Sequence, residues 1–302
     1  MKMHSWHLTC LAGAVVLALG GCSSSGGSGT GLTTGTTIGT TTGTTTGTTT
    51  GTTTGTTTGT TTGTTTGTTT GTTTLEGYAI IGSPTDSTGT TASVSDAPSY
   101  IAPSSLTEAL TTLKVDGYTF TFTNNSGTAS RSDGSGTVHW GANYDVTSYA
   151  SYGIVDTDIQ TDRSGYVFYQ GQVTSPSDMP VTGTATYAGT FYIQGGNQNS
   201  YINATGTSNF SVDFLNHTLN GTLTATQNLD SSAQLPASSI YLTAALNGNA
   251  FSGTNTATGT VTTGKFFGPQ AAELAGQFYN GNTTGASPLG QPFIGAFGAR
   301  KQ

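Results

Sequence analysis

Charged side chains are scarce in this chain of 302 residues, and basic ones are the rarest. They make up 7% of residues, with 7 Lys and Arg against 14 Asp and Glu. Without Lys2, which lies in the N-terminal signal described next, 6 basic and 14 acidic side chains remain, a net charge of about −8. No basic cluster exists to release counterions, so we expect neither nucleic acid nor an anionic membrane patch as a partner.

Cysteine is almost absent, and both copies lie near the N-terminus. The apolar run from Leu8 to Leu19 is too short for a membrane span of ~20 residues but suits a secretory signal. It ends in Leu19-Gly20-Gly21-Cys22, which resembles a bacterial lipobox, where a peptidase cuts before a cysteine that carries a diacylglyceryl group. We therefore expect residues 1–21 to be removed with Cys10 and Cys22 to be lipidated, which excludes a disulfide. The alternative is an ordinary signal peptide.

Residues that commonly perform catalysis are also few. Outside the signal, the only histidines are His139 and His217, and no Gly-x-Ser-x-Gly elbow occurs. Glu273 lies in an alternating segment, where a carboxylate more often braces a strand than acts as an acid or base. The acidic loop from Asp156 to Asp162 lacks the glycine and glutamate of an EF-hand, which favours a solvated loop. We expect no enzyme.

Glycine and threonine are abundant by contrast. From Gly35 to Thr74 the chain repeats Gly-Thr-Thr-Thr with a period of four, broken only at Ile38. Such a tract has no apolar face to offset the entropy of ordering it, and its period is too short for a solenoid repeat. We predict that residues 22–74 form a disordered tether with a span of about 40 Å. A glycosylated stalk or an adhesive threonine array is the alternative.

Residues 75–178 are predicted to form a small β domain. Leu75 to Pro103 is expected to be irregular with one possible edge strand. Capping-box spacing at Ser105 to Glu108 predicts one short helix, with Leu113 on its apolar face. Alternation and turn signals then predict strands, which we place at Tyr118–Phe122, Gly136–Trp140, Tyr144–Tyr149, Ser151–Val155 and Gly165–Val173.

Residues 179–302 alternate very regularly between apolar and threonine-rich positions. Ala185, Tyr187, Phe191 and Ile193 share one face, and about eight such strands follow one another. The opposite face is Thr, Asn, Ser and Gly, whereas a membrane barrel needs an apolar outer band. The fold class predicted is therefore all-β, with a soluble, antiparallel barrel of about eight strands that is closed and so has no exposed edges.

Several segments resemble the transferrin-binding protein B family of surface lipoproteins and related surface lipoproteins such as factor H binding protein. The lipobox and low-complexity tether agree with it, and four stretches carry the resemblance over roughly the last 120 residues: Gly183–Gly189, Val212–Phe214, Gly264–Phe278 and Gly295–Lys301. The resemblance implies an eight-stranded barrel preceded by a smaller sheet, called a handle. One handle and one barrel are expected here, where the namesake has two lobes.

The resemblance also implies a location and a function. Ser23 after Cys22 is similar to lipoproteins sent to the outer membrane, and the family implies export to the cell surface by a surface lipoprotein assembly translocator. Capture of a host protein or an iron-containing ligand through barrel-end loops and the handle is the expected function, with Tyr144, Tyr149, Tyr152 and Tyr201 as candidate contacts. The alternatives are a haem-binding protein with His139 or His217 as axial ligand, and a structural or adhesive protein.

Overall fold

A computed structural model of the chain describes residues 74–83, 93–95, 98–158, 165–197 and 200–302, except 232, 234, 237 and 282–286. It also describes the backbone of paired dipeptides between residues 33 and 66. The chain divides into two compact units, Met1–Gly71 and Thr72–Gln302. Cys22 and the signal segment lie outside the described residues, so their roles stay predictions.

The first unit differs from the tether without secondary structure that we expected. Its described residues form nine short strands: β1 (Thr33–Thr34), β2 (Thr37–Ile38), β3 (Thr41–Thr42), β4 (Thr45–Thr46), β5 (Thr49–Thr50), β6 (Thr53–Thr54), β7 (Thr57–Thr58), β8 (Thr61–Thr62) and β9 (Thr65–Thr66). The pairing is parallel, with Thr33 opposite Thr49 and Thr49 opposite Thr65. Paired strands are therefore separated along the chain by four Gly-Thr-Thr-Thr repeats. This is a longer period than the single repeat on which the expectation of a disordered tether rested.

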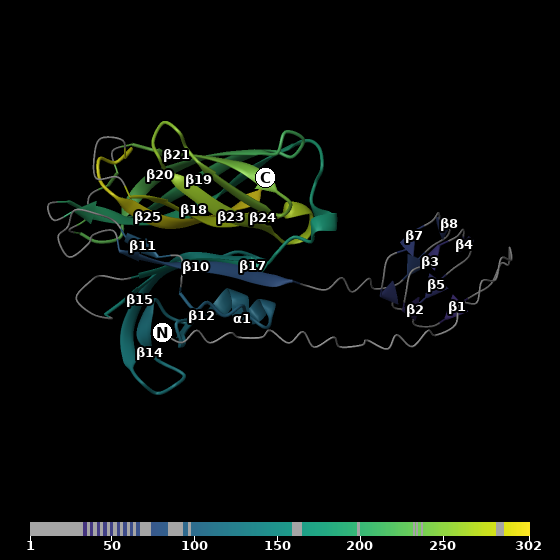
Figure 1. Cartoon of the computed structure of the whole chain (residues 1–302), viewed down its shortest axis with the longest axis horizontal. Helices are drawn as coiled ribbons and strands as arrows, with labels where there is room; N and C mark the ends of the chain where they lie inside the picture. Colours follow the sequence, from purple (N-terminus) through teal and green to yellow (C-terminus); the bar gives the residue numbers. More distant parts are fainter. Residues whose placement is uncertain are drawn as a thin grey trace, which may run out of the picture. The chain divides into compact units, whose positions relative to one another are not determined.

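The second unit begins with a six-stranded sheet in the order β11-β10-β17-β16-β15-β14. A two-stranded hairpin and one helix pack beside it, and we call the sheet, hairpin and helix together the handle (Figure 1). Its elements are β10 (Leu75–Ser83), β11 (Ser93–Ser95), α1 (Leu106–Thr111), β12 (Thr112–Val115), β13 (Tyr118–Thr121), β14 (Ser126–Ser130), β15 (Thr137–Val146), β16 (Ala150–Thr157) and β17 (Gly165–Gln172).

Strand β10 corrects the expectation of an irregular segment with a possible edge strand. It lies inside the sheet, paired with β11 on one side and β17 on the other. Its neighbouring residues Ala79 and Ile80 are both buried, in different clusters on the two faces. A strand covered on both faces reads as a short apolar run without alternation, and so gives a weak sequence signal.

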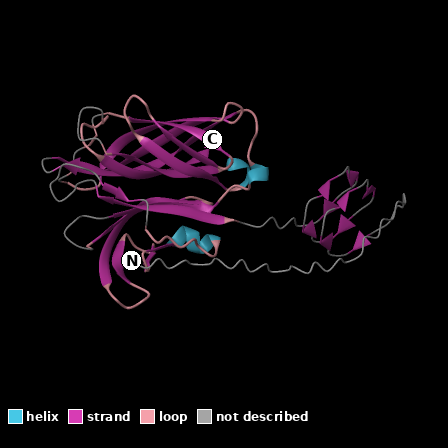
Figure 2. Cartoon of the chain, in the orientation of Figure 1, coloured by secondary structure: helices cyan, strands magenta, loops and turns pink. Residues whose placement is uncertain are grey.

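The helix and the following strands are close to the prediction. Ser105 caps α1 by accepting a hydrogen bond from the Glu108 N–H at 3.1 Å, as the capping-box spacing indicated. Leu113, expected on the helix, instead lies in β12, because pairing with Phe120 of β13 ends the helix early. Figure 2 shows how little of the chain is helical. The strand expected over 144–149 ends at Val146, and residues 147–149 turn toward β16.

Residues from Thr184 onward form the predicted closed antiparallel barrel of eight strands. It is preceded by the 3₁₀ turn η1 (Pro176–Asp178), and β25 closes it by pairing with β18. Its elements are β18 (Thr184–Asn197), β19 (Ser200–Asp213), β20 (Thr218–Asn228), β21 (Ile240–Asn247), β22 (Ala250–Thr254), β23 (Val261–Phe267), η2 (Pro269–Ala271), β24 (Glu273–Asn280) and β25 (Phe293–Lys301).

Phenylalanine rings facing glycines fill the barrel interior. The predicted inward residues Tyr187, Phe191 and Ile193 are at most 1% exposed. A Cβ atom on Gly264 would lie 2.3 Å from the Phe251 ring, and similar close approaches occur at Gly221, Gly276 and Gly295. The interior of a barrel of this size is just wide enough to be filled by side chains, so glycine makes room for each ring.

The two ends of the barrel differ. The connections 214–217, 248–249 and 268–272 are short and lie at one end, which we call the turn end. The connections 229–239, 255–260 and 281–292 are longer and lie at the other, which we call the loop end. Figure 1 shows the turn end on the right and the loop end on the left. The barrel therefore has one end with short connections and one end with long connections.

Candidate functional site

The handle sheet packs on the outside of the barrel through an apolar seam. Tyr152 and Tyr169 of the handle lie against Phe267, Ala275 and the β25 alanine at 296, all nearly fully buried. Burying a large side chain of this kind stabilises by roughly 1.5–3 kcal/mol. These contacts hold the handle and the barrel together as one body, and the polar groups at the seam fix how the two are aligned.

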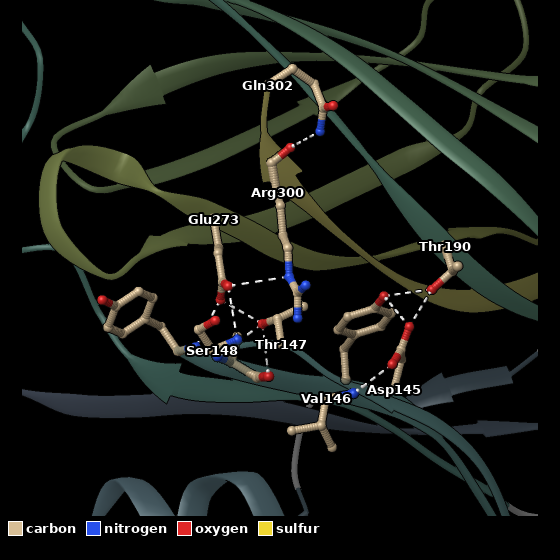
Figure 3. Close-up of polar contacts among 11 residues, drawn as sticks. Asp145, Val146, Thr147, Ser148, Thr190, Glu273, Arg300 and Gln302 are labelled. Atoms are coloured by element: carbon tan, nitrogen blue, oxygen red, sulfur yellow. Dashed lines mark hydrogen bonds and ion pairs between the residues drawn. The ribbon is translucent and has the colours of Figure 1, made fainter.

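Glu273, at the start of β24, holds the turn between β15 and β16 (Figure 3). Its side chain is 3% exposed and accepts hydrogen bonds from the Thr147 hydroxyl at 2.5 Å and from the Ser148 and Tyr149 backbone N–H groups, both at 2.9 Å. The Arg300 Nε lies 3.6 Å from the same carboxylate. The residue that looked most like a catalytic acid therefore braces the handle against the barrel.

The adjoining Gly268-Pro269 turn contacts the same handle segment, residues 147–149, at Tyr149. Gly268 has φ +71° and ψ −179°, a conformation open essentially to glycine alone. A Cβ atom there would lie 2.4 Å from the Tyr149 ring. The Thr174 hydroxyl donates to the Gly268 carbonyl oxygen at 2.7 Å. Gly264–Phe278, one of the stretches that carry the family resemblance, is thus a part of the barrel on which the handle docks.

Further along the seam, a carboxylate on β15 joins handle and barrel (Figure 3). Asp145 accepts hydrogen bonds from the Tyr152 hydroxyl at 3.2 Å and from the Thr190 hydroxyl of β18 at 2.8 Å. The Tyr192 hydroxyl donates to the Tyr144 carbonyl oxygen at 3.0 Å. Burial, and then the charge of Asp145, raise the pKa of Tyr192 to about 12 and that of Tyr152 further still. These phenols stay protonated as hydrogen-bond donors.

The handle meets the loop end of the barrel at its far edge. Gln194, near the end of β18, donates to Asp156 of β16 at 2.7 Å. The C-terminal end of β16 therefore lies beside the end of β18, on the side of the loop end. At the opposite side, Val173 donates its N–H to the Thr74 carbonyl oxygen at 3.0 Å and bridges to Phe267 at the turn end. The chain thus joins the folded unit at the turn end.

A cleft of about 600 Å³ opens in the handle near the end of β16. Ile81, Ile101, Tyr118 and Tyr166 line it, and the guanidinium of Arg131 lies 5.4 Å from the centre of the Tyr118 ring. Tyrosine and arginine beside exposed isoleucine are the residue types that often dominate protein interfaces. The cleft is a candidate contact in the handle.

The structure places three of the four predicted contact tyrosines within the fold. Tyr152 is 1% exposed, Tyr149 packs on Gly268, and the Tyr144 ring stacks on Phe122 with centroids 4.6 Å apart. Tyr144, Tyr149 and Tyr201 are all half-buried, but Tyr201 lies on β19 opposite Gly196, close to the loop end. Only Tyr201 of the four lies beside the long loops.

The two predicted histidines lie in different parts of the fold. His139 on β15 is 80% exposed, and its Nδ1 is 2.9 Å from Asp158. His217 is exposed in the turn between β19 and β20, with φ +53°. Among the described residues there is no group of three or more His, Cys, Asp and Glu placed to hold a metal ion. In the same part of the chain, no helix is long and apolar enough to cross a membrane.

Sequence reasoning did not find the polar residues that join handle to barrel. Asp145, Thr190 and Gln194 each sit on an alternating strand among other polar residues. Their partners lie 38 to 45 positions away in the chain. The one sequence signal for Asp145, Thr190 and Gln194 was their position on the outward face of their strands, the face that the handle–barrel seam covers in the fold.

Comparison with known proteins agrees with this geometry. The family model for the C-lobe and N-lobe beta barrels of Tf-binding protein B matches residues 179–301. Transferrin-binding protein B of Haemophilus influenzae (strain ATCC 51907 / DSM 11121 / KW20 / Rd) is 32% identical over 199 residues, which are 51% of this chain and 31% of that protein.

Solved structures show the same fold. The structure of intact Ap-TbpB, with N and C lobes, has a TM-score of 0.52 and 21% identity, covering 75% of this chain and 46% of that one. A point mutant of transferrin-binding protein B from Haemophilus parasuis Hp5 has a TM-score of 0.50 and 23% identity, covering 76% and 45%. The chain spans less than a third of the curated relative and under half of the solved ones. Residues 179–301 form a β-barrel that matches the family model for the transferrin-binding protein B barrels, in agreement with the resemblance that the sequence indicated.

Proposed function

We propose that this protein is a lipid-anchored lipoprotein of the outer-membrane surface that captures a host protein at its loop end. The observation that supports this is the polarity of the folded unit. The chain arrives at the turn end through Thr74, while the long loops, Tyr201 and the end of β16 lie at the other. An anchor at Cys22 would therefore leave the loop end facing outward.

The loop end has the chemistry of an adaptable contact surface. Its connections are rich in Ser, Asn, Thr and Gly, which offer flexible hydrogen bonding. Leu235 and Tyr241 add exposed apolar area there, with 45% and 56% of their surfaces accessible. Transferrin is the first host protein to test, because the 32% identical relative is named a transferrin-binding protein. This chain covers 31% of that relative, so transferrin binding is part of the proposal. We propose binding rather than catalysis, and no observation favours haem over a protein ligand.

Binding to immobilised mature protein tests the proposal, with transferrin and whole serum as separate probes. Tyr241→Ala and Tyr201→Ala should each weaken capture by roughly tenfold, as expected for tyrosines central to an interface. Leu215→Ser is the matched control, because Leu215 is 64% exposed but lies at the turn end. Capture of no serum protein, or equal losses in all three variants, would contradict the proposal.

Surface location is tested separately. Protease treatment of intact cells should release the folded unit if it faces outward, and Cys22→Ser should move the protein out of the membrane fraction. Export through a surface lipoprotein assembly translocator predicts loss of this protease-sensitive pool when the translocator is deleted. Full protection of the protein in intact wild-type cells would instead indicate a periplasmic orientation.

A further inference from the structure

The two most exposed large apolar side chains of the described residues lie on two adjacent segments at the turn end. Val181 is 76% exposed and Leu215 is 64% exposed. Phe214 donates its N–H to the Gly183 carbonyl oxygen at 3.0 Å, which holds the two segments side by side. Single exposed apolar residues are ordinary on a protein surface. These two are the most exposed and lie on neighbouring segments at one end of the barrel, and we call them the patch.

The charges around the patch nearly cancel. The Lys301 ammonium lies 5.6 Å from the centre of the Phe214 ring and donates to the Gln270 carbonyl oxygen at 3.1 Å. Asp213 accepts hydrogen bonds from the backbone N–H groups of Leu215 and Asn216, both at 3.0 Å. Hydrogen bonds from Asn216, and then from Leu215, lower the pKa of Asp213 and keep it ionised at neutral pH. Lys301 and Asp213, of opposite charge, therefore both lie close to Phe214 and Leu215.

The place where the chain joins the folded unit indicates what the patch faces. Thr74 meets Val173 at the turn end, next to the segment that leads to Val181. The chain before Thr74 runs back to Cys22, the predicted site of lipid attachment. A domain held by such a segment stays at high effective concentration near the surface, so a weak contact is enough to be occupied.

We propose that Val181, Leu215 and Lys301 form a lipid-contacting patch that seats the turn end on the membrane to which the chain is anchored. This inference rests on the anchoring part of the proposed function. The apolar side chains enter the interface between headgroups and acyl chains, while the lysine stem lies along the apolar surface with its ammonium at headgroup level. Because Asp213 balances Lys301, the contact depends on apolar burial rather than on anionic lipid.

The mature chain supplies its own means of testing this. Cys22 is its only cysteine and can be coupled through a thioether to a maleimide lipid in phosphatidylcholine vesicles that contain brominated acyl chains. Tryptophan placed by Leu215→Trp reports contact with these lipids through quenching of its fluorescence. Leu235→Trp, at the loop end, is the matched control, and Trp140 adds the same background to both.

Brominated lipid should quench Leu215→Trp at least about twofold more than Leu235→Trp, and adding Val181→Ser should reduce that difference. Replacing some phosphatidylcholine with phosphatidylglycerol should change the quenching little. Equal quenching at both positions, or none at either, would overturn the proposal. A several-fold rise with phosphatidylglycerol would overturn the apolar assignment.

A second copy of the chain is the competing occupant of the patch. If the uncoupled mature protein sediments as a dimer and Leu215→Ser makes it a monomer, the patch is a contact between copies and the proposal fails. A monomer that keeps its bromolipid quenching supports it. None of these measurements needs a host protein, so a failure of capture and a failure of membrane seating are seen separately.

Discussion

Glu273 of the barrel accepts a hydrogen bond from the backbone N–H of Tyr149 in the handle, at 2.9 Å. The two residues are 124 positions apart in the chain, and the carboxylate that receives the bond is almost fully buried. A buried carboxylate that satisfies two backbone donors and a hydroxyl can be removed only by leaving those groups without partners. The relationship makes the handle–barrel junction the part of this protein most open to test.

Glu273→Ala should lower the free energy of unfolding by about 3 kcal/mol, because the Ser148 and Tyr149 N–H groups lose their acceptor. Urea denaturation of the mature protein measures the change. Arg300→Ala is the control, since Arg300 is 57% exposed and 3.6 Å from the carboxylate, and should cost less than about 0.5 kcal/mol. Similar losses in the two variants would show that Glu273 acts mainly through its ion pair.

Gly268→Ala should destabilise the protein by about 2 kcal/mol more than Gly248→Ala. Both glycines have positive φ, +71° and +59°, so both substitutions strain the backbone. Only at Gly268 would the new Cβ atom meet the Tyr149 ring, whereas nothing lies within 4 Å at Gly248. Thermal or urea unfolding of the pair measures the combined cost of the Tyr149 contact and of the glycine-only backbone conformation at Gly268. Equal effects would mean that Tyr149 moves aside without cost.

Glu108 should contribute stability that is lost in acid. Hydrogen bonds from Lys114, and then from the Ser104 backbone and hydroxyl, lower the pKa of Glu108 from 4.5 to about 2. A carboxyl whose pKa is lower when folded stabilises above its unfolded pKa and loses this effect as pH falls toward the folded value. The gap in unfolding free energy between wild type and Glu108→Gln should therefore shrink between about pH 5 and pH 2. A gap that is independent of pH would contradict the assignment.

Tyr192 should contribute stability that is lost in alkali. Burial raises the pKa of Tyr192 from 10.0 to about 12, so the unfolded chain releases this proton first and unfolding becomes easier as pH rises between these values. Tyr192→Phe should reduce that dependence and, through loss of the bond to the Tyr144 carbonyl, cost about 1 kcal/mol at neutral pH. Unfolding free energies from pH 7 to pH 11 check this, with tyrosinate absorbance as a second readout. Unchanged alkaline sensitivity in the variant would assign the effect to other tyrosines.

Sequence reasoning reached the barrel more fully than the handle. Alternation marks strands such as β18, where Tyr187 and Phe191 face the core and threonines face outward. Strand β10 escaped it, because Ala79 and Ile80 are buried on opposite faces and leave no alternation to read. The burial of the predicted contact residue Tyr152 escaped the sequence for a similar reason. Nothing in its local sequence reveals that Thr190 and Asp145 will cover it.

By itself, the sequence determined the elements whose causes are local: the alternating barrel strands, the helix start at Ser105, and the kind of barrel, through the stretch from Gly264 to Phe278. Only the tertiary structure decided what that stretch does. Glu273 could be a site, a surface charge or a brace, and the choice depends on whether a distant turn covers it. Residues 147–149 do so, because the handle buries its apolar face on the barrel and brings their N–H groups to the carboxylate.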